Sequence, residues 1–472
     1  MHRVLHVLTT VLCLVAPFAA GAARGADVPR RPNIVVIVAD DLGYADLGFQ
    51  GGRDVPTPHL DALAARGVRC TSGYVSGPYC SPTRAGLLTG RYQQRFGHEF
   101  NPGPAGPDNA AVGLPLSETT LAQRLRQAGY ATGLVGKWHL GHGPEYQPQA
   151  RGFDEFFGFL GGAHGYGPFP DGDKGPNAIR RGREPVAEKE YLTDAFAREA
   201  VTFIDRHAAA PFFLMLTFNA VHTPMEARAG SEARFAGVTP PRRRTYAAML
   251  AAMDDAVGKV TAALAERKLT GDTVVFFISD NGGPPVNASS NGALRGHKAT
   301  TWEGGVRVPF VVSWPGTLPA GKTYDEPVIQ LDIAPTALAA AGIARPDGLD
   351  GVDLRPFLAG DRRGAPHDAL YWRFGQQRAI RMGNWKLVDA TGGTGPMLVD
   401  LAADLGEQTD KSTAEPQARQ RLEEAWKTWN ATLQEPRWGR GNPARQRQRQ
   451  QQRQRQPQGG RQTVPPVPAS DR

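Results

Sequence analysis

Cysteine is scarce in this chain, which has three cysteines among 472 residues. Cys13 lies in an apolar amino-terminal stretch, so Cys70 and Cys80 are the two that a processed chain would keep. This number excludes the dense disulfide framework of small secreted domains. A single disulfide between Cys70 and Cys80 is one alternative, and a chemical role for Cys80 is the other.

Apolar runs long enough to cross a bilayer are also lacking. Residues 1–26 combine a basic start, an apolar run over residues 7–20 and a small-residue exit, which together are typical of a signal peptide. We therefore expect an exported protein, periplasmic or secreted, with no membrane span after processing.

The body of the chain lacks a basic bias. Residues 437–472 contain nine arginines and one acidic residue, Asp471, and this stretch accounts for the whole net charge of +8. We therefore expect no nucleic-acid partner for the folded part. The stretch itself is rich in Arg, Gln and Pro, and we predict a disordered tail. Binding of nucleic acid or an anionic glycan by the tail is the alternative.

What the chain does contain is a series of short apolar runs separated by helical stretches. Strands are predicted at residues 34–39, 130–135, 212–218, 273–279 and 308–313. Helices are predicted at residues 57–66, 117–128, 193–207 and 244–267. This alternation predicts an α/β domain over residues 30–364, with a large, mixed, mostly parallel sheet sandwiched by helices.

The pattern changes near residue 365. Short strands separated by turn residues are predicted at residues 369–372, 377–381, 385–388 and 397–400, and an amphipathic helix at about 416–433. We therefore predict a smaller antiparallel α+β subdomain over residues 365–436.

Polar side chains follow two of the predicted strands. Asp40 and Asp41 come after the first, and Asp280 and Asn281 come after the strand at residues 273–279. Ligands of open α/β sheets bind beyond the carboxyl ends of the strands, so we expect these four to converge. Three carboxylates and an amide oxygen suit Ca²⁺ or Mg²⁺ better than zinc. Simple turn-capping roles are the alternative for each taken singly.

Two sequence signatures carry a family resemblance. CSPTRAGLLTGRY at residues 80–92 contains the core C-x-P-x-R, and GYATGLVGKWHLG covers residues 129–141. Further matches are the opening ADDLGYADLG and, after the two signatures, NAVHTP, SDNGG and LRGHKATTWEGGVRVPF. Over residues 32–405 the chain resembles type I, formylglycine-dependent sulfatases of the arylsulfatase and N-acetylgalactosamine-6-sulfatase type. The resemblance implies an alkaline-phosphatase-like fold.

The resemblance also implies the chemistry of the site. A formylglycine-generating enzyme would oxidise Cys80 to formylglycine, which would join the acidic group as a further ligand of one cation, Ca²⁺ with Mg²⁺ as the alternative. Arg84 would hydrogen-bond the hydrated aldehyde. Lys137 and Lys298 would bind the sulfate oxygens, with His297 as a rival to Lys298.

Two histidines complete the implied machinery. His139 would deprotonate the second hydroxyl of the aldehyde hydrate and so expel sulfate, and His222 would protonate the leaving alcohol. His98, Glu99 and Asn101 are either pocket residues or ordinary loop residues.

The expected function is hydrolysis of sulfate esters, with a sulfated carbohydrate as the first expected substrate class and an aryl sulfate as the second. A phosphate or phosphonate ester hydrolase using the same site, and a glycan-binding pseudoenzyme, are the alternatives.

Overall fold

The computed structural model describes residues 31–439, with gaps at residues 105, 107–108, 110, 173–174 and 176. The described residues belong to one compact unit that begins at Arg31. The predicted signal peptide and the predicted tail from residue 440 onward lie outside the described residues. Within the described part of the chain, no helix is both long and apolar enough to cross a membrane.

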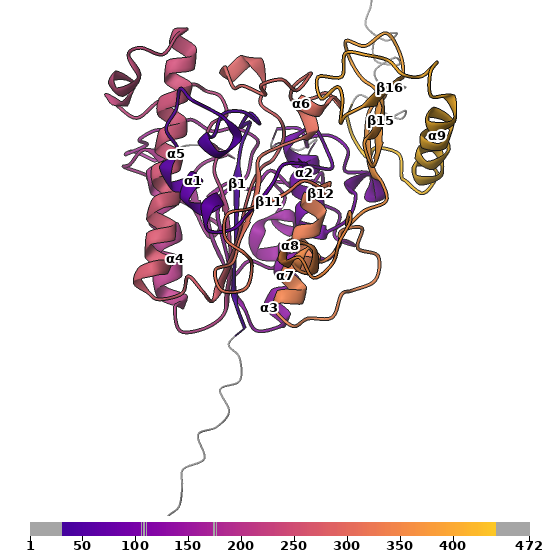
Figure 1. Ribbon diagram of the computed structural model, residues 1–472. Helices are drawn as coiled ribbons and strands as arrows, with labels where there is room; N and C mark the ends of the chain where they lie inside the picture. Colours follow the sequence, from indigo (N-terminus) through magenta and orange to yellow (C-terminus); the bar gives the residue numbers. More distant parts are fainter. Residues whose placement is uncertain are drawn as a thin grey trace, which may run out of the picture. The chain divides into compact units, whose positions relative to one another are not determined.

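A ten-stranded mixed sheet occupies the centre of this unit (Figure 1). Its five central strands run parallel in the order β9-β1-β8-β4-β5. Their bounds are Thr273–Ser279, Asn33–Ala39, Phe212–Thr217, Ala131–Lys137 and Glu155–Phe159. β1, β8 and β9 are buried along their whole length, which explains their continuous apolar and β-branched sequences.

The edges of the sheet are mixed. On one side β10, β2 and β11 follow β9, with β10 antiparallel to it, and on the other side β6 and β7 follow β5. Their bounds are Phe310–Ser313, Val68–Cys70, Lys322–Tyr324, Arg180–Arg181 and Glu184–Pro185. A separate parallel pair joins β3 (Gly73–Tyr74) to β12 (Val328–Ile329).

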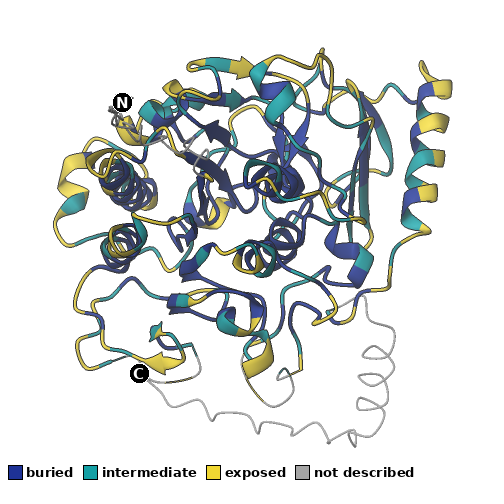
Figure 2. Ribbon diagram, turned by 90° about the horizontal axis from the view of Figure 1, so that it is seen from below, coloured by how far each residue is buried: buried dark blue, intermediate teal, exposed yellow. Residues whose placement is uncertain are grey.

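Helices cover both faces of the large sheet. One face packs against α1 (Pro58–Ala65), α4 (Leu192–His207) and α5 (Pro241–Glu266). The opposite face packs against α2, α3 and α7, which lie on the other side of β1 in Figure 1. The bounds of these three are Cys80–Thr89, Leu121–Gln127 and Ile333–Ala340. Figure 2 shows the strands at the centre of the sheet as buried, whereas strands at its edge contain exposed residues.

The carboxyl-terminal part forms a second, four-stranded antiparallel sheet in the order β13-β14-β15-β16. Its strands are Leu370–Phe374, Gln377–Met382, Trp385–Asp389 and Met397–Asp400. Helix α9 (Pro416–Asn430) packs on this sheet, and Trp429 stacks on Tyr371 with ring centroids 5.0 Å apart. The large helix-covered sheet and this smaller sheet confirm the predicted fold class; the boundaries at residues 364 and 436 stay predictions.

The ends of the predicted strands lie within two residues of the observed ends, and the strands at residues 273–279 and 397–400 match on both sides. β5 was not predicted, because EFFGF is short and follows a loop that carries no helical pattern. The predicted helix at residues 117–128 begins later, at Leu121, because Thr120 is its amino-terminal cap. The Thr120 hydroxyl accepts from the Gln123 amide, and the Gln123 side chain accepts from the Thr120 amide.

A buried ionic cluster connects the second sheet to the main body. Lys386 on β15 lies 2.9 Å from a carboxylate oxygen of Glu303 and 2.9 Å from one of Glu407, and all three side chains are essentially inaccessible to solvent. Glu303 begins the short helix α6 (Glu303–Val306), so the cluster joins β15 of the second sheet to the main body. Burial raises the pKa of Glu407 to about 7, because it shares its one lysine with Glu303.

Replacing Lys386 by Met should lower the free energy of unfolding by about 3–5 kcal/mol, because two buried carboxylates lose their shared cation. Urea denaturation followed by fluorescence measures the change. Lys427→Met is the matched control, since Lys427 is mostly exposed and its ion pair with Glu423 spans 3.6 Å; it should cost less than about 1 kcal/mol. Equal effects of the two substitutions would contradict a structural role for the buried cluster.

Candidate active site

Strand register places the acidic residues at one level. Ala39 at the end of β1 pairs with Ser279 at the end of β9, so Asp40 and Asp280 leave the sheet side by side. Asp41 has a φ of 61° and turns back toward this tip, where its amide donates to an Asp280 carboxylate oxygen at 3.3 Å. The side-chain amide of Asn281 donates a hydrogen bond to the carboxylate of Asp41 at 2.7 Å. The four residues expected to converge therefore lie together, and all four are buried.

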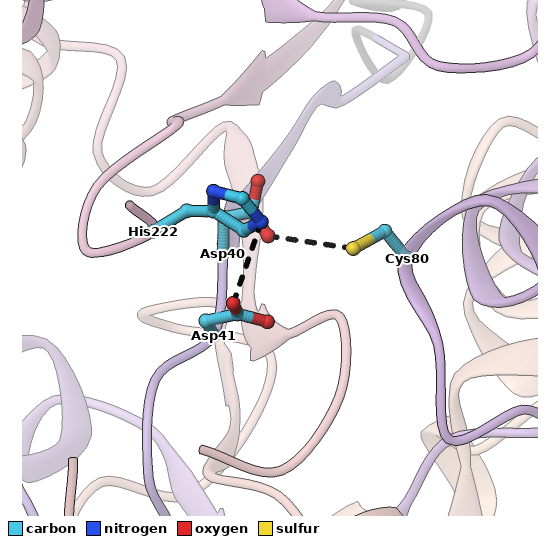
Figure 3. A group of neighbouring side chains, drawn as sticks. All are labelled: Asp40, Asp41, Cys80 and His222. Atoms are coloured by element: carbon cyan, nitrogen blue, oxygen red, sulfur yellow. Dashed lines mark hydrogen bonds and ion pairs between the residues drawn. The ribbon is translucent and has the colours of Figure 1, made fainter. Parts of the chain in front are cut away.

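Cys80 reaches this acidic group from helix α2, not from the sheet. It is the first residue of α2, and its Sγ lies 3.7 Å from Oδ1 of Asp40 (Figure 3). Potential ligand atoms of Asp40, Asp41, Cys80 and His222 all lie within 4.8 Å of one another. Cys70 is a free buried thiol, so the alternative of a Cys70–Cys80 disulfide is not the arrangement found.

Three cations surround the carboxylates. Lys137, the last residue of β4, bonds Asp40, and Lys298 bonds Asp41 at 2.7 Å. The Arg84 guanidinium on α2 donates twice to Asp280, at 2.8 and 3.1 Å, and once to the carbonyl of Lys137. Arg84 thus connects the helix that carries Cys80 to both strand tips, and it forms no hydrogen bond to Cys80 itself in this structure.

These contacts determine the charge state of the site. Burial would raise the pKa of Asp40, but Lys137, His222 and Arg84 outweigh it, so the pKa is lowered and the carboxylate is ionised. Burial would lower the pKa of Lys298, but the negative groups around it raise it well above its usual value. Burial also raises the pKa of the Cys80 thiol to about 12. An unmodified Cys80 is therefore a protonated thiol and a poor nucleophile.

The acidic group fits a hard divalent cation. Oδ1 of Asn281 is buried and has no hydrogen-bond partner among the described residues, although its amide nitrogen is fully used. A buried carbonyl oxygen without a donor is costly unless something else binds it. Together with the three neighbouring carboxylates it forms an all-oxygen set of the kind that binds Ca²⁺ or Mg²⁺.

A cavity of about 470 Å³ opens over Cys80 and is called the active-site pocket below. His139, His222 and Lys298 line it with Cys80, and so does Asn101. Gly162 lines the pocket next to the ring of His139, and a side chain at this position would clash, because its Cβ would lie 2.6 Å from the ring. His222 Nδ1 donates to the Thr223 carbonyl at 2.6 Å, which leaves Nε2 facing Asp41 at 3.5 Å.

His98 lies beneath this pocket and does not line it. The Ser81 hydroxyl donates to the carbonyl of His139 at 2.6 Å, so the His98 Nε2–H, also at 2.6 Å, donates to Ser81. Burial lowers the pKa of His98 to about 3, which keeps the ring neutral. His139 has a φ of 60°, an uncommon backbone conformation that this chain of hydrogen bonds supports. His98 thus holds the hydroxyl of Ser81, next to Cys80, and Ser81 in turn bonds the backbone of His139.

The remaining loop candidates have separate positions. Lys298 reaches Asp41, whereas the ring of its rival His297 bonds the Lys298 carbonyl at 2.8 Å. Glu99 pairs with Arg373 at 2.8 Å, away from Cys80.

His142 and Asn177 also line the active-site pocket, and sequence reasoning missed both. No motif marks them, because their loops meet the pocket only in the folded chain.

Comparison with known proteins shows the family of this chain. The family model described as Sulfatase matches residues 32–343, and the model described as N-sulphoglucosamine sulphohydrolase, C-terminal, matches residues 297–418. Both models describe enzymes that hydrolyse bonds to sulfate groups, so the class of protein is a sulfuric ester hydrolase. The chain belongs to the sulfatase family.

Individual relatives extend the match over most of the chain. N-acetylgalactosamine-6-sulfatase of Sus scrofa is 36% identical over 399 residues, which cover 79% of this chain and 74% of that protein. Arylsulfatase A of Bos taurus is 38% identical over 380 residues, covering 74% and 72%. The crystal structure of Ps i-CgsB in complex with k-i-k-neocarrahexaose superposes with a TM-score of 0.83 at 35% identity, covering 89% of this chain and 97% of that one.

We expect His98→Phe to lower kcat for sulfate-ester hydrolysis by about 10- to 100-fold with little change in KM, because displaced reacting groups lose effective alignment. The phenyl ring keeps the edge contact with Trp438 but cannot donate to Ser81. Sulfate release measured by ion chromatography at varied substrate concentration separates the two constants. His207→Phe, at the far end of α4, is the matched control and should keep the parent kcat. An unaltered kcat in His98→Phe would contradict a positioning role.

Proposed function

We propose that this enzyme hydrolyses sulfate esters of carbohydrates, with formylglycine formed from Cys80 and one divalent cation held by Asp40, Asp41, Asp280 and Asn281. The observation that carries the proposal is the 3.7 Å approach of Cys80 Sγ to Asp40 at the base of a pocket that is also lined by three histidines and Lys298. This sulfur marks the position that the aldehyde-derived oxygens would occupy.

The net reaction consumes one water, breaks the S–O bond of the ester and yields an alcohol and inorganic sulfate. Hydrated formylglycine would supply one hydroxyl as the nucleophile and a second hydroxyl through which sulfate is later released, and the cation would supply positive charge next to them. A buried thiol with a pKa of about 12 cannot do the same work, which supports modification of Cys80.

The lysines would neutralise the sulfate group. Sulfate oxygens repel an anionic nucleophile, and charge on them grows as the ester bond breaks. Lys298 is charged and lines the pocket, and Lys137 lies at the strand tip next to Asp40. Arg84 would hydrogen-bond the hydrate beside it while its bonds to Asp280 keep α2 in place.

The histidines would move the protons. Burial, followed by the charges of Lys137, Arg84 and Lys298, lowers the pKa of His139 well below its usual value, so its ring is a neutral proton acceptor. The Nδ1 of His222 is engaged by a carbonyl, so Nε2 is the nitrogen available to protonate the leaving oxygen. Such acid catalysis contributes ~10²–10⁴-fold.

A carbohydrate substrate is supported by the relatives and by the pocket. One relative is named for N-acetylgalactosamine-6-sulfate chemistry, and Ps i-CgsB was solved with k-i-k-neocarrahexaose, an oligosaccharide. The active-site pocket presents amides and imidazoles from Asn101, Asn177 and His142 that can hydrogen-bond sugar hydroxyls. The partner that this function requires is a formylglycine-generating enzyme that reads the C-x-P-x-R motif, and the predicted signal peptide supports action in the periplasm or outside the cell.

Cys80→Ala should abolish sulfate release from every substrate, because no group remains to attack sulfur. Activity on a panel of sulfated mono- and disaccharides and on 4-nitrophenyl sulfate measures this. Cys70→Ala is the matched control and should stay active, since Cys70 is buried in β2 away from the pocket. Mass spectrometry of the tryptic peptide covering residues 70–84 should show oxygen in place of sulfur at Cys80. An unmodified thiol in fully active enzyme would refute the mechanism.

Removal of divalent cations with a chelator should abolish activity, and Ca²⁺ or Mg²⁺ should restore it. The cation should also raise the melting temperature, because it binds the folded state only. In the Asp41→Asn variant, the cation should raise the melting temperature much less than in the parent enzyme. Asp255→Asn, on α5 in a second group of ionisable side chains with Asp254 and His59, should keep the full shift, because Asp254 bonds the backbone amides of His59 and Leu60. Full activity of a cation-free preparation would contradict the proposed site.

A further inference from the structure

A second and larger cavity lies where the second sheet meets the main body. Its volume is about 740 Å³, within the usual range of about 300–1,000 Å³ for ligand pockets. Phe374, Gln376 and Arg378 from β13, β14 and the turn between them line it, with Trp426 on α9 and Phe100 from the main body. We call this cavity the side pocket.

An aromatic wall separates the side pocket from the active-site pocket. Tyr79, next to Cys80, lines the active-site pocket, and its ring centroid lies 5.6 Å from that of Phe374 in the side pocket. Phe100 lies 5.0 Å from Phe374, and its neighbour Asn101 lines the active-site pocket. One layer of rings therefore divides the two cavities.

The floor of the side pocket is also tied to the loop that carries Lys298. Gln377 donates to the carbonyl of Ala299 at 2.8 Å and accepts from the backbone amides of Thr301 and Thr391. Because Ala299 follows Lys298 directly, the two pockets share a fixed backbone segment. A ligand long enough to pass the aromatic wall could occupy both pockets at once, and the distance between its two bound parts would be set by this segment.

The side pocket has the chemistry of a sugar subsite. Trp426 and Phe374 offer apolar ring surface, and the exposed Gln376 amide has no hydrogen-bond partner among the described residues. Arg378 lies over the Trp426 ring at 5.4 Å, and its ion pair with Asp389 is long, at 3.6 Å. Arg373, in contrast, is engaged by Glu99, Asn430 and the Gln434 carbonyl. Arg378 is thus the cation in this pocket with donors left for an incoming anionic group.

We propose that the side pocket binds the sugar residues next to the one that carries the scissile sulfate, with Arg378 and Gln376 as the determinants for a second anionic or hydroxyl group. This inference rests on the proposed function and adds that the substrate is an anionic oligosaccharide, recognised on both sides of the Tyr79–Phe374 wall.

The test compares chain lengths. Full-length mature enzyme, coexpressed with a formylglycine-generating enzyme, is assayed on sulfated neocarrahexaose, sulfated neocarrabiose and 4-nitrophenyl sulfate. Arg378→Gln should lower the ratio of kcat/KM for the hexasaccharide to kcat/KM for 4-nitrophenyl sulfate by about tenfold, mainly through KM, because a charged hydrogen bond is lost. Gln376→Ala should change the ratio in the same direction, and Arg378→Lys should restore part of it.

Arg126→Gln is the matched control. Arg126 also forms an exposed ion pair, with Asp154 at 2.8 Å, and lines neither pocket. If the enzyme hydrolyses the hexasaccharide and the ratio is the same in Arg378→Gln, Gln376→Ala and Arg126→Gln, the side pocket is not a subsite, although the proposed function stands. If 4-nitrophenyl sulfate is hydrolysed and neither saccharide is, the carbohydrate substrate and the side-pocket proposal both fail.

Discussion

Three carboxylates meet at the tips of two adjacent parallel strands, and the whole site is organised around their charge. Buried like charges repel strongly in a medium of low dielectric constant, so each carboxylate must have a positive partner. Lys137 and Lys298 bond Asp40 and Asp41, and Arg84 bonds Asp280. These partners come from β4, from the loop before α6 and from α2. The requirement for charge balance therefore brings three separate segments to one point.

The same requirement explains why Cys80 lies where it does. Arg84 is one helical turn beyond Cys80 on α2, and its bonds to Asp280 and to the Lys137 carbonyl hold the start of that helix against the sheet. Below it, the hydrogen bonds from His98 through Ser81 hold the backbone of His139. A reactive group at position 80 would thus be positioned by residues that do not touch a substrate.

The second sheet contributes more than stability. Its ionic cluster with Glu303 is buried as deeply as the active-site charges, and Gln377 bonds the segment that carries Lys298. The sheet therefore helps to hold one side of the active-site pocket, and its own rim forms the side pocket. The rim of this sheet can therefore vary in sequence without altering the residues around Cys80.

The sequence by itself determined the fold class, most strands and the chemical group at the strand tips. Buried parallel strands such as residues 273–279 have an unmistakable apolar pattern, and the motifs around Cys80 and Lys137 are local in the chain. Tertiary structure alone decided which loop residues reach the pocket: His142 and Asn177 enter it, Glu99 turns away, and His98 lies beneath. Those positions depend on contacts between segments up to several hundred residues apart, such as Glu99 with Arg373, and no local pattern records a contact of that kind.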